Sequence, residues 1–260
     1  MPINNTANKV LKATFWYAFS DFLLKGLAFI TTPIFSRILT KAEYGIFANY
    51  STWYTLLATV ITLHLRVSLT RARFDFEKDL NSFITSILIL GSVATFLSGI
   101  IIFINNDFFS NLFSLDKKYI LMMCAMAFVS PAYDMFLAMQ RFYYKYKLVA
   151  IMTVIVSLTS IGLSLLLILT MKDHLLARII GSVAPQFLVS TVLYVYYLLK
   201  CGEIQTKYWA YSLPVAVPYI FHALSGNVLA QSDRVMITSI CGATMTAINS
   251  VFYVREKVRC

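Results

Sequence analysis

Charged residues are scarce in this sequence. Asp, Glu, Lys and Arg make up 13% of the 260 residues, about half the share of roughly 25% that soluble domains carry. Hydrophobic residues reach 59%, and 15% of the chain is aromatic. This balance excludes a soluble enzyme and a disordered tail, and it leaves a membrane protein with many side chains suited to the lipid–water boundary.

Cysteine pairs and catalytic motifs are also absent. The four cysteines, Cys124, Cys201, Cys241 and Cys260, show no CxxC pair and no paired spacing, so neither a disulfide framework nor a cysteine metal site is expected. The sequence contains no HExxH, no GxSxG, no glycine-rich phosphate loop and no HD or DxD pair in a loop. We therefore expect no catalytic residue, no cofactor and no bound metal.

Long extramembrane segments are missing as well. The longest connections between apolar runs, residues 105–118 and 200–210, have no room for a folded domain. Any function must therefore reside inside a helical bundle or at its two ends, which argues against most enzymes.

Apolar runs dominate what remains. A helix needs about 20 apolar residues to cross the hydrocarbon core, and seven runs meet this length. They are Thr14–Arg37, Tyr44–Leu65, Phe83–Ile104, Tyr119–Met139, Leu148–Met171, Leu175–Leu199 and Tyr211–Ile240. The sequence therefore predicts an all-α, polytopic membrane bundle of about seven helices. The first run lacks a small-residue cleavage site, so we expect it to be retained as a span.

The basic residues predict the orientation of the bundle. With the N-terminus in the cytoplasm, eleven Lys and Arg residues fall in cytoplasmic segments and six, including Arg178, in external ones, as the positive-inside rule favours. The same rule explains most of the net charge of +10, so we expect no nucleic-acid partner, and Arg141–Lys147 is interpreted as an anchor for lipid headgroups. Seven spans place the basic tail Arg255–Arg259 on the external side, so we expect that the chain stops before its architecture is complete.

A lysine lies deep in the first apolar run. Asp21 and Lys25 are four residues apart, so they share one helical face in the favourable acid-before-base order. A lysine near the middle of the bilayer costs about 3 kcal/mol on insertion scales. Two interpretations stay open: a structural ion pair, or a cationic group that faces a water-filled cavity and awaits an anionic substrate.

Two further ionisable residues lie inside predicted spans. Asp134 follows Pro131 in the fourth run, where it is either a protonatable coupling residue or a polar anchor near the interface. His222 lies near the centre of the seventh run, and a buried histidine with a satisfied partner is the simpler interpretation there.

The remaining intramembrane charges lie towards the ends of their spans. His64 and Arg66 lie near the cytoplasmic end of the second run, where long side chains reach the headgroups. Asp233 and Arg234 lie towards the outer end of the seventh run, and we expect an interfacial ion pair between them. In the third run, Gly91, Thr95 and Gly99 are spaced by four, which predicts a tight helix-packing face.

A weak internal repeat appears at an offset of 197 residues. This offset brings Arg37 onto Arg234 and Gly45 onto Gly242, and it brings Lys25 onto His222. Transporters are commonly built from repeated bundles. The pattern therefore predicts a six-helix lobe over residues 1–205, followed at 206–260 by the first helix and start of a second lobe.

Three segments carry a resemblance to a known family. Leu23–Tyr54, with its PIFSRIL run and Glu43-Tyr44-Gly45, resembles the opening of bacterial polysaccharide-biosynthesis flippases, the Wzx-like exporters of O-antigen and capsule units. Ala72–Asp79 and Asp233–Ile237 are also similar to that family's patterns. Members usually carry about twelve or more helices in two lobes, so the resemblance implies that this chain is truncated after its first lobe.

The resemblance implies a function and a set of partners. The substrate would be an oligosaccharide linked to a polyprenyl diphosphate, moved across the inner membrane by alternating access, with membrane lipids, a polysaccharide polymerase and chain-length proteins as partners. The candidate substrate contacts are Lys25, Asp21, Arg37, Arg66, His222 and Arg234, and the candidate coupling residues are Asp134 and Asp233.

Three other interpretations stay open. A cation-coupled multidrug exporter of the same fold would use acidic cavity residues, and Asp21 and Asp134 are available, although Lys25 argues against it. A membrane-embedded polymerase or glycosyltransferase would need a sizeable external or acidic loop, which is missing. An inactive remnant, or a half-unit that pairs with another chain, is the third.

Overall fold

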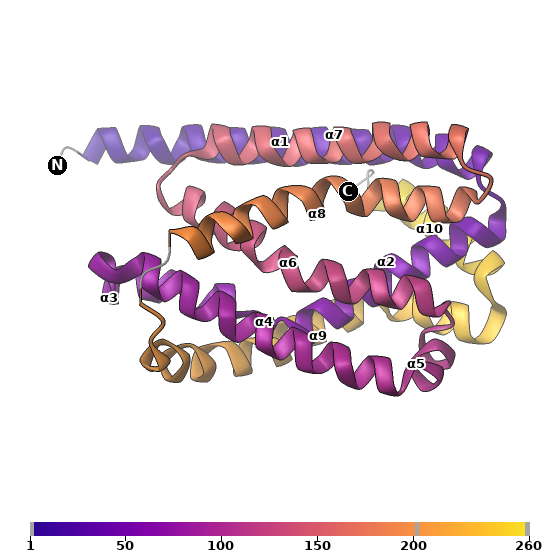
Figure 1. The fold of residues 1–260 in the computed structure, drawn as a ribbon. Coiled ribbons are helices and arrows are strands. Elements are labelled where there is room, and N and C mark those ends of the chain that lie inside the picture. The colour runs from indigo at the N-terminus through magenta and orange to yellow at the C-terminus, as the bar shows by residue number, and fades with distance from the viewer. Residues whose placement is uncertain (1–2, 201–202, 258–260) are drawn as a thin grey trace.

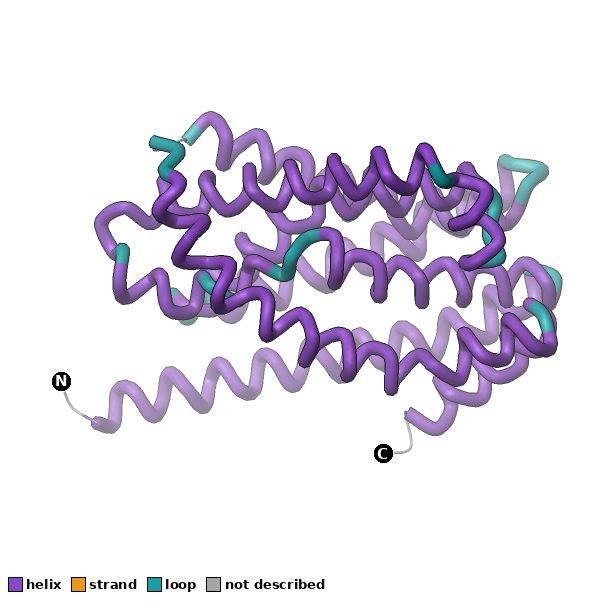
Figure 2. The backbone as a smooth tube through the Cα atoms, turned by 90° about the horizontal axis from the view of Figure 1, so that it is seen from below, coloured by secondary structure: helices purple, strands orange, loops and turns teal. Residues whose placement is uncertain are grey.

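Long helices lie side by side in this protein and form one bundle (Figure 1). The computed structural model describes residues 3–200 and 203–257, with side chains placed within 11–200 and 203–250. Within these ranges the chain contains helices and short connections but no strand, as the second view also shows (Figure 2). The expected all-α bundle is therefore confirmed.

Ten α-helices and two short 3₁₀ turns make up the described chain. In order they are α1 (Ile3–Ile38), α2 (Lys41–Ile61), η1 (Leu65–Val67), α3 (Leu69–Asp75), η2 (Glu77–Asp79), α4 (Leu80–Ile104), α5 (Asn106–Phe113), α6 (Lys117–Phe142), α7 (Tyr146–Thr170), α8 (His174–Leu199), α9 (Thr206–Cys241) and α10 (Ala243–Lys257). Cys124 and Cys241 are free thiols. Cys201, Cys260 and the side chains of the basic tail lie outside the described residues.

Six of these helices are long and apolar enough to cross a membrane: α1, α4, α6, α7, α8 and α9. They match six of the seven predicted spans. The second predicted span, Tyr44–Leu65, was wrong at its end, because α2 stops at Ile61, and α2 is not apolar enough by itself. Polar side chains buried along α2, such as Asn49, Thr52 and Thr59, lower its hydropathy.

The start of α2 is fixed by its own sequence. The Oγ1 atom of Thr40 accepts the backbone N–H of Glu43 at 3.2 Å, and the Glu43 carboxylate accepts the backbone N–H of Thr40 at 2.8 Å. This reciprocal capping box satisfies two of the N–H groups that a helix start leaves free. It turns the chain sharply between α1 and α2.

Two glycines allow helices to touch backbone to backbone. A Cβ atom added to Gly45 of α2 would lie 1.7 Å from the carbonyl oxygen of Ala243 in α10. One added to Gly181 of α8 would lie 2.4 Å from the Cα of Ser164 in α7. Close approach of this kind at small residues is the usual way in which membrane helices gain packing energy.

The predicted small-residue face of α4 is confirmed in part. A Cβ on Gly91 would lie 3.6 Å from the Leu65 side chain, and Thr95 Oγ1 donates to the carbonyl of Ile61 at 3.3 Å. These contacts pack α4 against the end of α2. Gly99 differs, since a Cβ there would meet open space.

The N-terminal half of α9 is anchored on α4. The indole N–H of Trp209 donates to the carbonyl of Ser86 at 2.8 Å, and the Tyr208 ring meets Phe83 edge-on, with ring centroids 5.3 Å apart. Tyr208 and Phe83 are fully buried. This anchor fixes α9 where its middle part runs alongside α2.

Helices α1 and α9 have equal lengths of 36 residues. α1 ends at Ile38 and α9 ends at Cys241, 203 residues later, and a further helix follows each after a short turn. The predicted repeat offset of 197 residues therefore differs by six residues from the offset between the ends of α1 and α9. Gly45 lies inside α2, whereas Gly242, at φ +79°, forms the turn between α9 and α10. The Lys25–His222 and Arg37–Arg234 correspondences carry the same six-residue error.

Candidate functional site

Helix α2 breaks where it passes the middle of α4. It ends at Ile61, and Leu63 and His64 adopt the left-handed conformation, with φ of 53° and 45°. The chain then resumes through η1 and α3 towards the next helix. Gly91, which faces this break, is the twelfth of the 25 residues of α4. A left-handed leucine is costly and marks a site where surrounding structure holds the backbone in place.

A polar cleft opens beside the break. Its volume is about 680 Å³, within the usual range of small-molecule pockets. Helices α2, α6, α8 and α9 contribute side chains to it. The polar and aromatic lining residues are Tyr54, Thr55, Thr59, Thr62, His64, Arg66, Ser130, Asp134, Gln186, Tyr219, His222, Ser225 and Asn227.

One face of α2 supplies a row of hydroxyl groups. Thr55, Thr59 and Thr62 follow each other at spacings of four and three, so they share a helical face. The side-chain amide of Asn227 donates to Thr59 Oγ1 at 2.9 Å, and Thr52 Oγ1 donates to the amide oxygen of Gln231 at 3.2 Å. These bonds tie α9 to α2 along one side of the cleft.

Charged and ring-bearing side chains gather at the break itself. The Nε of Arg66 donates to Nε2 of His64 at 3.2 Å. The His64 ring packs against Tyr219 with centroids 5.2 Å apart, and Tyr219 meets His222 at 5.9 Å. Asp134 of α6 lines the same cleft, one turn after Ser130. The cleft therefore holds a guanidinium, a carboxylate and two imidazoles at the level where α2 is interrupted.

Three of the candidate site residues come together in this cleft: Arg66, Asp134 and His222. One of the sequence interpretations is corrected there, that of His222. The His64 and Arg66 side chains line the cleft beside the break of α2, and their expected contact with the headgroups stays a prediction. His222 is exposed to the cleft and is not a satisfied buried histidine, since the middle of α9 borders open space.

Asp21, Lys25 and Arg37 lie elsewhere, on α1, and line none of the cleft. All three side chains are exposed. Of the two interpretations left open for Asp21 and Lys25, the structural ion pair does not form; ion pairs are found instead at Lys117–Asp107 and Lys118–Asp173. Because both side chains are exposed, no packed neighbour holds them in the paired geometry.

Asp233 and Arg234 lie in the last third of α9, beyond the cleft. Asp233 is exposed and Arg234 is half-buried. Their predicted roles in coupling and substrate contact stay predictions, and the cleft does not include them.

Neutral polar residues were missed by the sequence reasoning. Tyr54, Thr55 and Thr59 of α2 carry no charge, and neither do Gln186 of α8 and Asn227 of α9, so a search for intramembrane charges passes over them. Two signals could have identified the cleft residues of α2: the low hydropathy of the run Tyr44–Leu65 and the spacing of its threonines along one helical face.

The arrangement suits a ligand with both anionic and hydroxyl groups. A guanidinium binds phosphate oxygens through fixed, charge-assisted hydrogen bonds. The hydroxyls of Thr55, Thr59 and Thr62 donate to backbone carbonyls one turn earlier and so offer acceptors to a ligand. Side-chain amides can both donate and accept, and tyrosine rings offer flat apolar faces. Irregular backbone at membrane depth is tolerated where it lines a cavity, and transporters place their binding sites at such breaks.

Comparison with known protein families gives a match along almost the whole chain. A family model described as polysaccharide biosynthesis protein matches residues 10–254, from α1 into α10. No curated protein and no solved structure matches the chain.

Proposed function

The chain belongs to the polysaccharide biosynthesis protein family, and from this membership and the polar cleft we propose that it is a flippase of the cytoplasmic membrane. Its substrate would be an oligosaccharide unit linked to polyprenyl diphosphate, destined for O-antigen, capsule or exopolysaccharide. The observation that carries this proposal is the cleft beside the break of α2, which combines Arg66 with a row of neutral polar groups.

The chemistry of the cleft matches the two polar parts of this substrate. A diphosphate and a glycan cannot cross hydrocarbon unaided, because their charges and hydroxyls would lose their hydration. Arg66 would bind the diphosphate, while Thr55, Thr59 and Asn227 would replace water around the sugar hydroxyls. Tyr54 and Tyr219 would pack against the sugar rings. The lipid tail would stay in the bilayer, and rocking of the helices around the cleft would give alternating access.

Lys25 keeps its predicted role as a second contact, because its position on α1 leaves the side chain exposed. Asp134 is the better placed of the two coupling candidates, since its carboxylate shares the cleft with Arg66 and Asp233 does not. A chain of this kind acts as a transporter and not as an enzyme.

Direct binding tests the proposal. The purified 260-residue chain in a lipid nanodisc should bind a short-chain polyprenyl diphosphate that carries a disaccharide. Arg66→Gln should weaken binding by about 10- to 100-fold, because a charge-assisted hydrogen bond contributes roughly 1.5–3 kcal/mol, and Arg66→Lys should retain part of the affinity. Arg71→Gln, which removes an exposed charge of α3 outside the cleft, is the matched control. Equal binding by the wild-type, Arg66→Gln and Arg71→Gln proteins would contradict the proposal.

Asp134 favours one alternative, a cation-coupled multidrug exporter with the same fold. A lipophilic cation such as tetraphenylphosphonium would then bind the same preparation, and Asp134→Asn would abolish its binding. Binding of the cation together with no binding of the diphosphate-linked sugar would favour this alternative.

A further inference from the structure

An apolar groove of about 380 Å³ runs between α4 and α6. It shares no lining residue with the polar cleft. Phe96 and Phe103 of α4 and Leu121 of α6 stand along it with 62%, 72% and 64% of their surfaces exposed, so the groove opens outward from the bundle. Gly99 leaves room in its middle, where an added Cβ would meet no other atom.

One end of the groove is polar. Asn106, the first residue of α5, and Lys117, the first residue of α6, line that end. The amide oxygen Oδ1 of Asn106 is buried and has no hydrogen-bond partner. The Lys117 ammonium forms an ion pair with Asp107 at 2.7 Å, and both of these side chains are exposed. A buried acceptor without a donor is costly, so Asn106 would gain from turning its side chain until Oδ1 meets a donor at this end of the groove.

The length of the groove matches one leaflet of a bilayer. Its lining extends from Thr95 of α4 to Asn106, the first residue of α5, and on α6 from Lys117 to Phe128. Eleven residue steps of α-helix span about 16 Å, and half of a hydrocarbon core of roughly 30 Å is about 15 Å. A long polyprenyl chain would exceed this length, whereas one acyl chain fits it.

We propose that the groove is a binding site for a phospholipid with a protonated amine in its headgroup, such as phosphatidylethanolamine. One acyl chain lies between α4 and α6, in the outer leaflet of the predicted orientation. The phosphate lies beside the Lys117 ammonium, and the amine donates to Asn106 Oδ1 and faces the Asp107 carboxylate. The paired charges of Lys117 and Asp107 complement a zwitterionic headgroup. Phosphatidylglycerol, with a net negative charge, would find no unpaired cation at this end.

Native mass spectrometry tests this site. The purified 260-residue chain in mild detergent is incubated with equal amounts of phosphatidylethanolamine and phosphatidylglycerol that carry the same acyl chains. The wild-type protein should retain phosphatidylethanolamine after the detergent is removed and should lose phosphatidylglycerol. Gly99→Leu fills the middle of the groove and should lose the retained lipid. Gly162→Leu, a substitution on α7 that also meets open space, should retain it.

A second pair of variants separates the headgroup from the acyl chain. Asn106→Leu removes the buried acceptor, so it should still retain lipid but lose the preference for phosphatidylethanolamine. Asn105→Leu alters an exposed neighbour whose amide donates to the carbonyl of Ile101, and it should keep the preference. The proposal is overturned if the wild-type protein retains both lipids equally, if Gly99→Leu retains phosphatidylethanolamine, or if an added polyprenyl phosphate displaces that lipid.

Discussion

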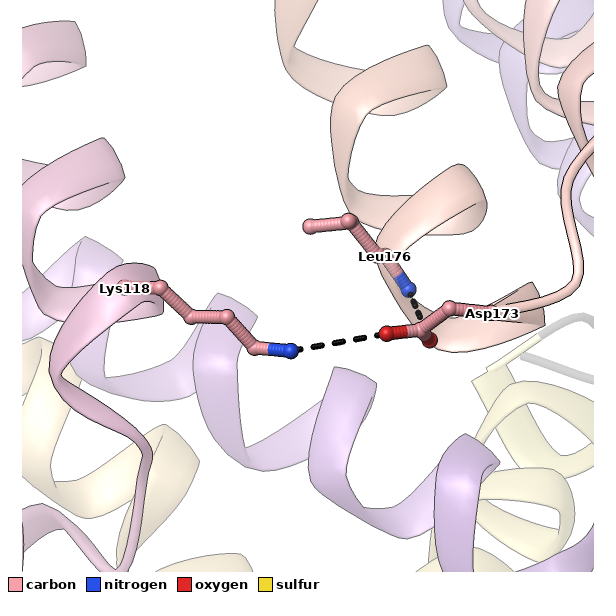
Figure 3. A network of polar contacts seen from close by, with 3 residues as sticks. All are labelled: Lys118, Asp173 and Leu176. Atoms are coloured by element: carbon pink, nitrogen blue, oxygen red, sulfur yellow. Dashed lines mark hydrogen bonds and ion pairs between the residues drawn. The ribbon is translucent and has the colours of Figure 1, made fainter.

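Two aspartates, Asp116 and Asp173, precede the long helices α6 and α8 at the same end of the bundle, and their side chains differ in the hydrogen bonds that they accept. Asp173 accepts the backbone N–H of Leu176 at 2.9 Å and the Lys118 ammonium at 3.4 Å (Figure 3). Asp116 stands before α6, and its side chain makes no capping hydrogen bond. The Leu176 N–H, and then the Lys118 ammonium, hold the pKa of the Asp173 carboxyl below its usual value.

This difference predicts a pH-dependent stability effect at Asp173. Asp173→Ala should lower stability by about 1 kcal/mol near neutral pH, as loss of an N-cap does. Because the folded-state pKa is depressed, the stabilisation is present above the unfolded value of about 4 and is lost as the pH falls through the folded value. Thermal unfolding in detergent at pH 7 and pH 3 measures the gap to wild type, which should shrink at pH 3. Asp116→Ala is the control, and an equal gap at both pH values would contradict the assignment.

Arg178 is an arginine whose surroundings the sequence did not reveal. The charge pattern places it among the external cations, but its guanidinium lies 3.7 Å from the ring centroid of Phe35 and 4.5 Å from that of Phe47. Its Nη1 also donates to Ser164 Oγ at 2.8 Å. Four helices, α1, α2, α7 and α8, therefore meet around one planar cation.

Arg178→Lys should destabilise the protein although it keeps the charge. An ammonium cannot stack flat between two rings, and a partly desolvated cation–π contact contributes about 1–2 kcal/mol. Thermal unfolding in detergent checks this result. Arg37→Lys, at an exposed arginine of α1, should change stability by less than about 0.5 kcal/mol. Similar small effects for both variants would show that the stacked geometry is not needed.

At the scale of the elements, the pairing of α7 with α8 depends on a missing side chain. Gly181→Ala places a Cβ 2.4 Å from the Ser164 backbone, so the two helices must move apart. Forced overpacking of this kind costs about 1–3 kcal/mol. Gly162→Ala, on α7 where the space is open, should be neutral or stabilising because alanine favours helix. Thermal unfolding of both variants measures the difference, and an unchanged Gly181→Ala protein would contradict the packing.

The helices that could be predicted from the sequence are those with uncharged apolar runs. α4 and α7 followed directly from such runs, which admit no other structure in lipid. The end of α2 could not be predicted, because neither glycine nor proline marks the break at Leu63 and His64. That break is held by the tertiary contacts of Leu65 with Gly91 and of Ile61 with Thr95, which lie 26 and 34 residues apart in the sequence.

The whole bundle has two ends, and polar contacts join the turns that belong to each. Lys118, at the start of α6, pairs with Asp173, in the turn between α7 and α8. At the opposite end, Arg73 of α3 donates to the carbonyl of Phe142, the last residue of α6, at 2.8 Å. The turns after α5 and α7 therefore share one end, as the predicted alternation of spans requires.

Reporter fusions test which end faces the cytoplasm. The positive-inside rule predicts that fusions after Lys78 and Lys145 report from the cytoplasm, and that fusions after Ser110 and Lys172 report from outside. A dual reporter that is active in only one compartment on each fusion reads the result directly. The opposite pattern would contradict the predicted orientation. Different signals from the two fusions of one pair would contradict the assignment of those turns to the same end of the bundle.

At this scale the candidate site could be predicted only in part. The sequence singled out Arg66, Asp134 and His222 because charge or titratable groups are rare in apolar runs, and packing brought them into one cleft. It also singled out Lys25 and Arg234 for the same reason, and packing left them outside the cleft. Which intramembrane charges meet depends on how α2, α6 and α9 are rotated about their axes, and the spacing within one helix does not contain that information.

The low hydropathy of α2 has a consequence for how the protein is made. A nascent helix leaves the translocon sideways when its own composition prefers lipid, and α2 is not among the helices that are apolar enough to do so. We therefore expect α2 to enter the bilayer only after α4 has been synthesised, when Gly91 and Thr95 of α4 can pack against the end of α2. The threonines that give the cleft its polarity thus impose an order of assembly on the ribosome-bound chain.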